Sequence, residues 1–203
     1  MASIIPTWDL VPSSIICAGI DEVGRGAWAG PVVAAAVILP YGLAFDGLGD
    51  SKRVPQAARL RLDREIRRHA TTIGIGWVGP AEIDAYGLSW AVRQSGLRAL
   101  AALSGHADAI LLDGKHNYLA DDPRSSVTIH GDALIVPIAA ASIIAKVARD
   151  TYMEALGRVM PAFRFGAHKG YGTALHRQAL ERYGATIYHR MSYKPLRAYP
   201  PCR

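Results

Sequence analysis

Short apolar runs that stop at acidic residues are the feature that most limits what this chain can fold into. Residues 15–20 (IICAGI) end at Asp21 and Glu22, and residues 109–112 (AILL) end at Asp113. Apolar, β-branched runs of this length, bounded by charge or glycine, are typical of buried strands. We therefore expect a sheet in which strand ends carry carboxylates.

The rest of the chain alternates strand-like and helix-like segments. Glycines and Pro31 precede the second strand, which favours a reversal and antiparallel pairing with the first. Antiparallel strands followed by alternating helices and strands indicate an α/β fold with a mixed sheet. The further predicted strands are residues 32–39, 71–78 and 127–129; the predicted helices are residues 51–69 with Ser51 as N-cap, 81–103 with interruptions at Gly87 and Gly96, 139–156, and 173–183, which ends at Gly184.

Composition excludes several protein classes. The chain has 203 residues, half of them apolar and a fifth charged, which suits one globular domain rather than a disordered chain. No uninterrupted apolar run reaches membrane-spanning length, and the first residues do not have the pattern of a secretory signal. The two cysteines are far apart in the sequence and do not indicate a disulfide framework. A cytoplasmic protein is therefore expected. The net charge of +6 only permits a polyanionic partner.

Domain organisation follows from the same segments. We expect a single domain over residues 1–203, in which residues 1–14 form a short lead. Residues from about 160 to 203 are expected to form a small helical portion. Its Pro-rich tail after Lys194 is expected to be mobile or loosely docked.

Four acids, Asp21, Glu22, Asp113 and Asp132, predict a cation site. Ligands bind at strand ends of open α/β sheets, and carboxylates that meet there stay ionised only with a cation between them. Oxygen ligands select Mg²⁺ or Mn²⁺. Asp21 and Glu22 would face opposite sides of a regular strand, so both reach one site only if the strand ends or bends near Gly24. Each acid alone fits a solvated turn equally well, and Asp132 alone fits a turn better; the set of four favours the cation.

Three glycine- or lysine-containing segments could approach a nucleic acid. Residues 24–26 (GRG) would let a phosphate or sugar come close to the main chain, although a hairpin turn would use the same glycines. Residues 51–53 (SKR) precede a helix start, where an anion is favoured, or form a solvated basic turn. Residues 168–172 (HKGYG) could stack Tyr171 on a sugar or base while Lys169 neutralises phosphate.

Other chemistries receive less support from the sequence. His168 and His176 lack a third soft ligand for zinc and are expected to be surface or hydrogen-bonding histidines. Asp150 fits an ion pair within a helix better than a metal site. No phosphate-binding loop, dinucleotide fingerprint or serine nucleophile motif is present.

Eight motifs follow one another along the chain and together cover about residues 18–193. They are AGIDEVGRG (18–26), AGPVVAAAVIL (29–39), DSKR (50–53), LLDG (111–114), GD (131–132), AAASIIAKVARD (139–150), HKGYGT (168–173) and HRMSY (189–193). In this order they resemble bacterial ribonuclease HII, the type 2 ribonuclease H. The chain departs from the family pattern at two places: the family usually has Pro-Leu where this chain has Ala27 and Trp28, which bears on loop rigidity, and Arg53 replaces a lysine but keeps its charge.

The resemblance implies a ribonuclease H-like mixed five-stranded sheet flanked by helices, with a small C-terminal helical portion. It implies hydrolysis of the RNA strand in RNA–DNA hybrids and incision 5′ of single ribonucleotides in duplex DNA, as in ribonucleotide excision repair, with two Mn²⁺ or Mg²⁺ ions. The catalytic metal ligands would be Asp21, Glu22, Asp113 and Asp132. A non-catalytic duplex-binding module and a related metal nuclease acting on DNA are the alternatives.

The resemblance also implies how substrate is held. The main chain of residues 24–26 would contact the 2′-hydroxyl, Tyr171 would stack on the next deoxyribose, and lysines would hold phosphates. A monomer is expected, with a sliding clamp as a further partner for the C-terminal tail. The expected substrate-binding residues are Gly24, Arg25, Gly26, Lys52, Ser142, Lys146, Lys169 and Tyr171.

Overall fold

Five strands form one mixed sheet in the computed structural model of this protein, which describes residues 6–202. The strand order is β3-β2-β1-β4-β5; β1 pairs antiparallel with β2 and parallel with β4. The α/β mixed sheet and the antiparallel opening are therefore confirmed. The strands are β1 (Cys17–Val23), β2 (Val32–Ile38), β3 (Thr72–Val78), β4 (Ala109–Asp113) and β5 (Ser125–Thr128).

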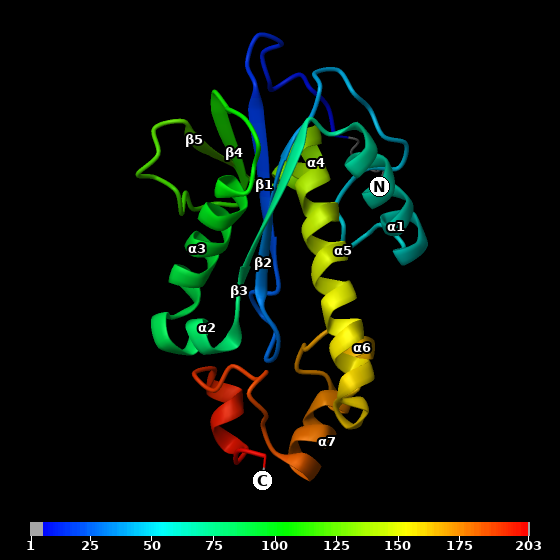
Figure 1. Ribbon diagram of the computed structural model, residues 1–203, viewed down its shortest axis with the longest axis vertical. Coiled ribbons are helices and arrows are strands. Elements are labelled where there is room, and N and C mark those ends of the chain that lie inside the picture. The colour runs from blue at the N-terminus through cyan, green and yellow to red at the C-terminus, as the bar shows by residue number, and fades with distance from the viewer. Residues whose placement is uncertain (1–5, 203) are drawn as a thin grey trace.

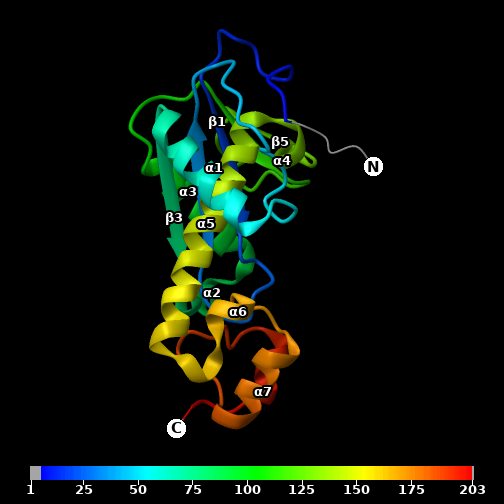
Figure 2. The ribbon, with the colours of Figure 1, turned by 90° about the vertical axis from the view of Figure 1, so that its right-hand side faces the viewer.

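Helices cover both faces of the sheet (Figure 1), with α5 and α1 on one side and α3 on the other. The long helix α5 also reaches beyond the sheet to the C-terminal portion (Figure 2). The helices are α1 (Gln56–His69), α2 (Pro80–Tyr86), α3 (Leu88–Ala101), α4 (Gly131–Leu134), α5 (Val136–Val159), α6 (Phe165–His168) and α7 (Ala174–Tyr183), with 3-10 turns η1 (Pro161–Phe163) and η2 (Lys194–Ala198).

The core follows the two-residue alternation of β2. Ala35 and Val37 pack with α5, whereas Ala34 and Ala36 pack on the opposite side with α3. Helix α5 approaches β1 so closely that a Cβ on Gly19 would lie 2.2 Å from the carbonyl carbon of Pro137. Small residues thus let α5 lie directly on the strand that carries Asp21 and Glu22.

Several predicted boundaries are wrong in an informative way. Strand β1 continues through Asp21 and Glu22 to Val23 because main-chain pairing with β2 is indifferent to side-chain charge. Helix α1 begins at Gln56 after Pro55, and the Ser51 hydroxyl accepts a hydrogen bond from Ser142 at 2.7 Å instead of capping the helix.

The predicted helix over residues 81–103 is two helices. The chain breaks at Gly87, whose φ of 85° lies in the left-handed region, whereas Gly96 stays inside α3. A Cβ on Gly96 would lie 2.9 Å from the Tyr118 ring, so the second glycine makes room for a side chain. Only the first of the two predicted interruptions therefore breaks the helix.

The C-terminal portion lies below the sheet in Figure 1 and includes α6, α7 and η2. The expectation of a mobile or loosely docked tail is wrong. Leu196 is fully buried with Leu180 and Ala185, and the main-chain N–H of Cys202 donates to the carbonyl of Ala185 at 2.6 Å. Within residues 6–202, no helix is long and apolar enough to cross a membrane.

Candidate active site

The predicted acids meet at the carboxyl ends of β1 and β4. The parallel register pairs Ile20 with Leu112, so Asp21 and Asp113 occupy the next position on each strand. Asp113 Oδ1 accepts a hydrogen bond from the main-chain N–H of Gly131 at 2.7 Å, which holds the start of α4 and its Asp132 beside the strand ends. Three of the four acids therefore come from three separate elements.

The electrostatics of this cluster disfavour its metal-free form. Burial raises the pKa of Asp21 well above its ordinary value, and the neighbouring charges of Glu22, Asp113 and Asp132 raise it further. Burial, and then Asp113, also raises the pKa of Asp132. Each shift records the cost of gathering anions out of water, which a cation would remove.

Glu22 turns away from Asp21, as strand alternation requires. Asp21 lies opposite Ala35, on the α5 side, whereas Glu22 lies opposite Ala34, on the α3 side. The Glu22 carboxylate pairs with Arg25 at 3.0 Å. Burial raises the pKa of Glu22, and Arg25 partly offsets that rise.

The donor set fits a hard divalent cation, but the ligands are not assembled around one. Within residues 6–202, no three Asp, Glu, His or Cys side chains are close enough to hold a metal ion as they stand. Four carboxylates without a soft ligand are nevertheless the chemistry that Mg²⁺ and Mn²⁺ prefer. A cation that used all four would have to draw Glu22 away from Arg25.

Lys52 belongs to the same site. Burial acts to lower the pKa of its ammonium, but attraction to Asp21, Asp50 and Asp132 outweighs burial and raises that pKa. The side chain therefore stays charged beside the acids. Ser142 adjoins it, since its hydroxyl bonds to Ser51, the residue before Lys52.

Two predicted substrate-binding lysines are engaged elsewhere. Lys146 Nζ lies 2.9 Å from Asp150, so the predicted structural ion pair of Asp150 is confirmed. Lys169 Nζ lies 2.7 Å from Glu154 and also donates to the carbonyl of Gly166. The structure does not bring either ammonium to the acid cluster.

The two glycine-containing loops are joined by their main chains. The N–H groups of Trp28 and Ala29 both donate to the carbonyl of Gly170, at 2.8 and 3.2 Å. Gly24 has a φ of 94°, a conformation that favours glycine, and Arg25 and Gly26 are exposed. Tyr171 is 36% exposed, and the Arg149 guanidinium carbon lies 5.6 Å from the centre of its ring.

Three residues near the site were given no role in the sequence analysis, although Arg149 and Arg190 lie within the motifs at 139–150 and 189–193. The Tyr118 hydroxyl lies 3.5 Å from Glu22, and burial followed by the Glu22 charge raises its pKa well above the usual value. Arg149 and Arg190 are fully buried. Arg149 also lies on the same helix face as buried Met153, four residues later, which is a signal for its burial.

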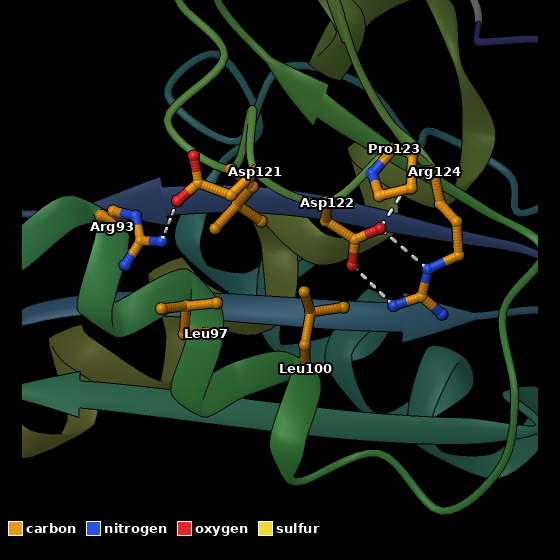
Figure 3. Close-up of a pocket in the computed structure, with 8 residues that line it drawn as sticks. Arg93, Leu97, Leu100, Asp121, Asp122, Pro123 and Arg124 are labelled. Carbon is orange, nitrogen blue, oxygen red and sulfur yellow. Dashed lines mark hydrogen bonds and ion pairs between the residues drawn. The ribbon is translucent and has the colours of Figure 1, made fainter.

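A cavity of about 400 Å³ lies apart from this site, between α3 and the segment before β5 (Figure 3). Arg93 points to Asp121, with 2.6 Å between them, and Asp122 points to Arg124, also at 2.6 Å. None of the four clustered acids lines the cavity. Its charged side chains are already paired, so it offers no catalytic group.

Comparisons with known proteins show the family of this chain. Residues 18–196 match the ribonuclease HII family. Ribonuclease HII of Streptomyces avermitilis is 45% identical over 188 residues, or 93% of this chain and 81% of the relative. The Moorella thermoacetica enzyme is 48% identical over 177 residues, or 87% and 85% of the two chains.

Solved structures show the same fold. Ribonuclease H2 from Pyrococcus horikoshii OT3 superimposes with a TM-score of 0.77 and 23% identity, and covers 90% of this chain and 95% of its own. RNase HII in the PCNA:RNase HII complex from Archaeoglobus fulgidus gives a TM-score of 0.74 and 25% identity, with 89% and 96% covered. Because its sequence matches the ribonuclease HII family model and its curated relatives, and its fold matches that of the solved structures, this chain belongs to the ribonuclease HII family and is a ribonuclease H.

Proposed function

We propose that this ribonuclease H, acting as a monomer, cuts RNA–DNA hybrids and also incises duplex DNA 5′ of single embedded ribonucleotides. The reaction leaves 3′-hydroxyl and 5′-phosphate ends and serves ribonucleotide excision repair. The observation that carries this proposal is the meeting of Asp21, Asp113 and Asp132 beside a glycine-containing loop in which Arg25 and Gly26 are exposed. Acids for hydrolysis and a surface for reading a sugar thus lie together.

The clustered acids are the proposed metal ligands. When bound, two Mg²⁺ or Mn²⁺ ions supply an activated water and stabilise the leaving 3′ oxygen. Asp21 would be the central ligand, because it is buried and interacts electrostatically with all three of the other acids. Lys52, held in its charged form by the same acids, neutralises a neighbouring phosphate.

Residues 24–26 and Tyr171 are proposed to distinguish RNA from DNA. Only the 2′-hydroxyl distinguishes the two sugars, and the main chain at a glycine can approach it closely because no side chain intervenes. A Cβ on Gly24 would lie 2.3 Å from Arg149 Nε, so this position excludes other residues. The exposed ring of Tyr171 then stacks on the deoxyribose that follows the ribonucleotide.

Replacement of one carboxylate tests the proposal. We expect Asp113→Asn to bind a duplex with one ribonucleotide as the parent does but to lose Mg²⁺-dependent cleavage by about 10²–10³-fold or more, because the group acts in the transition state. Asp46→Asn, an exposed acid away from the cluster, is the control. Cleavage by Asp113→Asn at the parent's rate would refute the proposed role of the acids.

The same assay separates the alternatives. A duplex-binding module would bind with strong salt dependence and give no product with Mg²⁺, Mn²⁺ or chelator. A DNA nuclease would cut the all-DNA duplex as well as the one with a ribonucleotide. Ribonucleotide-dependent incision that requires a divalent ion supports the proposed function alone.

The partner proposal extends to a sliding clamp. The Archaeoglobus fulgidus relative was solved as a complex with PCNA. Because Leu196 is buried within this fold, a clamp would contact the exposed residues 200–202 rather than the whole tail after Lys194. Calorimetric titration with a sliding clamp should show binding that deletion of residues 200–203 abolishes.

A further inference from the structure

Two buried arginines lack an acidic partner. Arg149 on α5 and Arg190 beyond α7 are both fully inaccessible to solvent. Neither forms an ion pair with a carboxylate anywhere in residues 6–202; the adjacent Asp150 pairs with Lys146 and Arg59 instead. Burial lowers the pKa of Arg149 to about 10. Buried, unpaired charges are costly, so the hydrogen bonds of these guanidiniums must compensate for that cost.

Arg149 holds both glycine-containing loops at once. Its Nε donates to the carbonyl of Pro31 at 2.9 Å, and its Nη2 donates to that of Ala29 at 3.1 Å. Its Nη1 donates to the carbonyl of Lys169 at 2.9 Å. The guanidinium carbon also lies 5.6 Å from the centre of the Tyr171 ring. One planar group therefore spans the space between residues 24–31 and residues 168–173.

Arg190 holds only the first loop. Its Nε and Nη2 both donate to the carbonyl of Gly30, at 2.9 and 2.8 Å, and its Nη1 donates to that of Arg25 at 3.0 Å. The Tyr193 hydroxyl donates to the same Arg25 carbonyl. The first loop is thus held by both arginines. Of the two, only Arg149 also donates to the second loop, where it adds to the main-chain bonds from Trp28 and Ala29 to the Gly170 carbonyl.

We propose that Arg149 is a positioning residue that determines substrate specificity by setting the spacing between the main chain of residues 24–26 and the ring of Tyr171. The inference rests on the proposed function, in which the first element contacts the 2′-hydroxyl and the second stacks on the following deoxyribose. A ribonucleotide followed by deoxyribose is read by both loops together. A uniform RNA strand offers no deoxyribose to Tyr171, so its cleavage depends less on that spacing.

Arg149→Lys tests whether the planar guanidinium is needed. Lysine keeps the charge but presents its donors from a single point, so it cannot hold three carbonyls in the arrangement of a guanidinium. Misplacement by about 1 Å can cost on the order of 10²-fold in rate. For the duplex with one ribonucleotide, we expect kcat/KM to fall by about 10–100-fold, with KM raised; for the uniform hybrid we expect less than about a threefold fall.

Two further measurements separate positioning from a loss of folding. Arg158→Lys makes the same change at an exposed position of the same helix and should leave both substrates unaffected. Hydrogen exchange of Arg149→Lys should be faster in residues 24–31 and 169–173 but unchanged in the sheet. Should the lysine variant fail to fold, Arg149→Gln, which buries no charge, is expected to show the same change in substrate ratio.

The outcomes are distinct. Two results would overturn the inference and leave the proposed function intact. One is an equal fall in kcat/KM on both substrates; the other is an unchanged ratio of the two kcat/KM values together with unchanged hydrogen exchange in residues 24–31 and 169–173. Failure of the parent enzyme to cut at a single ribonucleotide would overturn the proposed function and this inference with it. A selective loss on the single-ribonucleotide duplex, with uniform-hybrid cleavage retained, supports both.

Discussion

Trp28 shows how one residue can connect two loops and the tail. It stands where the resemblance leads us to expect leucine, and its indole lies against Gly172: a Cβ on that glycine would be 2.2 Å from Trp28 Cε2. The ring also packs against the buried cluster of Leu180, Ala185 and Leu196. Gly172 is therefore required by contact with a large neighbour, and the departure from the family pattern has a packing role.

A double-mutant cycle measures this contact. Gly172→Ala should lower the free energy of unfolding by about 1–3 kcal/mol, because the methyl group overpacks against the indole. In a Trp28→Leu background, which itself costs about 1–3 kcal/mol from lost packing, the same change should cost almost nothing. Urea unfolding measures both values.

The control for this cycle is Gly49→Ala, since a Cβ at Gly49 meets no atom within 4 Å. Its expected effect is below about 0.5 kcal/mol in either background. Equal costs of Gly172→Ala with and without Trp28 would contradict the packing argument.

At the scale of elements, three buried histidines join α6, α7 and the segment before η2. Each ring nitrogen has a partner that fixes the proton: His168 Nε2, His176 Nδ1 and His189 Nε2 must each carry a hydrogen, because the first two face carbonyl oxygens and the third faces a ring nitrogen. The expected hydrogen-bonding role is confirmed, although these rings are buried rather than on the surface. The partners are Phe163 O at 2.8 Å and Gly170 N at 3.2 Å for His168, Tyr171 O at 3.1 Å for His176, and His176 Nε2 at 3.0 Å and Thr186 N at 2.9 Å for His189.

This network predicts a pH dependence of stability. Burial lowers the pKa of His176 to about 3 and that of His189 to about 4, against about 6.5 in an unfolded chain. Between about pH 4 and 6.5 the unfolded chain binds more protons, so the stabilising contribution is complete above 6.5 and decreases as the pH falls. Each histidine adds a slope of up to about 1.4 kcal/mol per pH unit.

Urea unfolding from pH 7.5 to 4.5 tests this slope. The double variant His176→Gln and His189→Gln should show a flatter decline in the free energy of unfolding than the parent enzyme. His116→Gln removes an exposed histidine and should leave the slope unchanged. Parallel curves for parent and double variant would show that these histidines are not held neutral.

The elements and the acids could be predicted from sequence for different reasons. Strands β2 and β3 were located within one residue of each end, because apolar runs bounded by glycine, proline or charge mark where a sheet is buried. The joining of Asp21 and Asp113 followed from the rule that parallel strands end at one edge. The strands thus followed from local patterns alone, whereas the meeting of the acids needed one topological rule in addition.

Contacts between segments that are distant in the sequence could not be predicted from it. Arg149 donates to the carbonyls of Ala29, Pro31 and Lys169. Every residue has a main-chain carbonyl, so the sequence does not indicate which ones accept hydrogen bonds from a distant side chain. The docking of Leu196 likewise depends on Leu180 and Ala185 of other elements. The Lys169–Glu154 pair joins residues far apart in the sequence, whereas Lys146 and Asp150 are four residues apart on one helix, a spacing that could have indicated their pairing.

At the scale of the molecule, charge is distributed unevenly. The chain carries a net charge of +6, yet four of its 17 acids gather at the ends of β1 and β4 and in α4. Burial and mutual repulsion raise the pKa of Asp21 and Asp132, so the metal-free cluster opposes folding. The same arrangement that prepares the molecule for cations thus makes it less stable without them.

Divalent ions should therefore stabilise the whole fold. At a concentration of about 100 times its dissociation constant, an ion that binds only the folded state adds about 2.7 kcal/mol to the free energy of unfolding. We expect an increase of this order with Mg²⁺ or Mn²⁺ relative to chelator, measured by urea unfolding. Asp21→Asn removes the central repelling charge, so it should be more stable than the parent in chelator and gain less from the ion. Asp46→Asn should behave as the parent, whereas equal ion-dependent gains for the parent and Asp21→Asn would exclude Asp21 as a ligand.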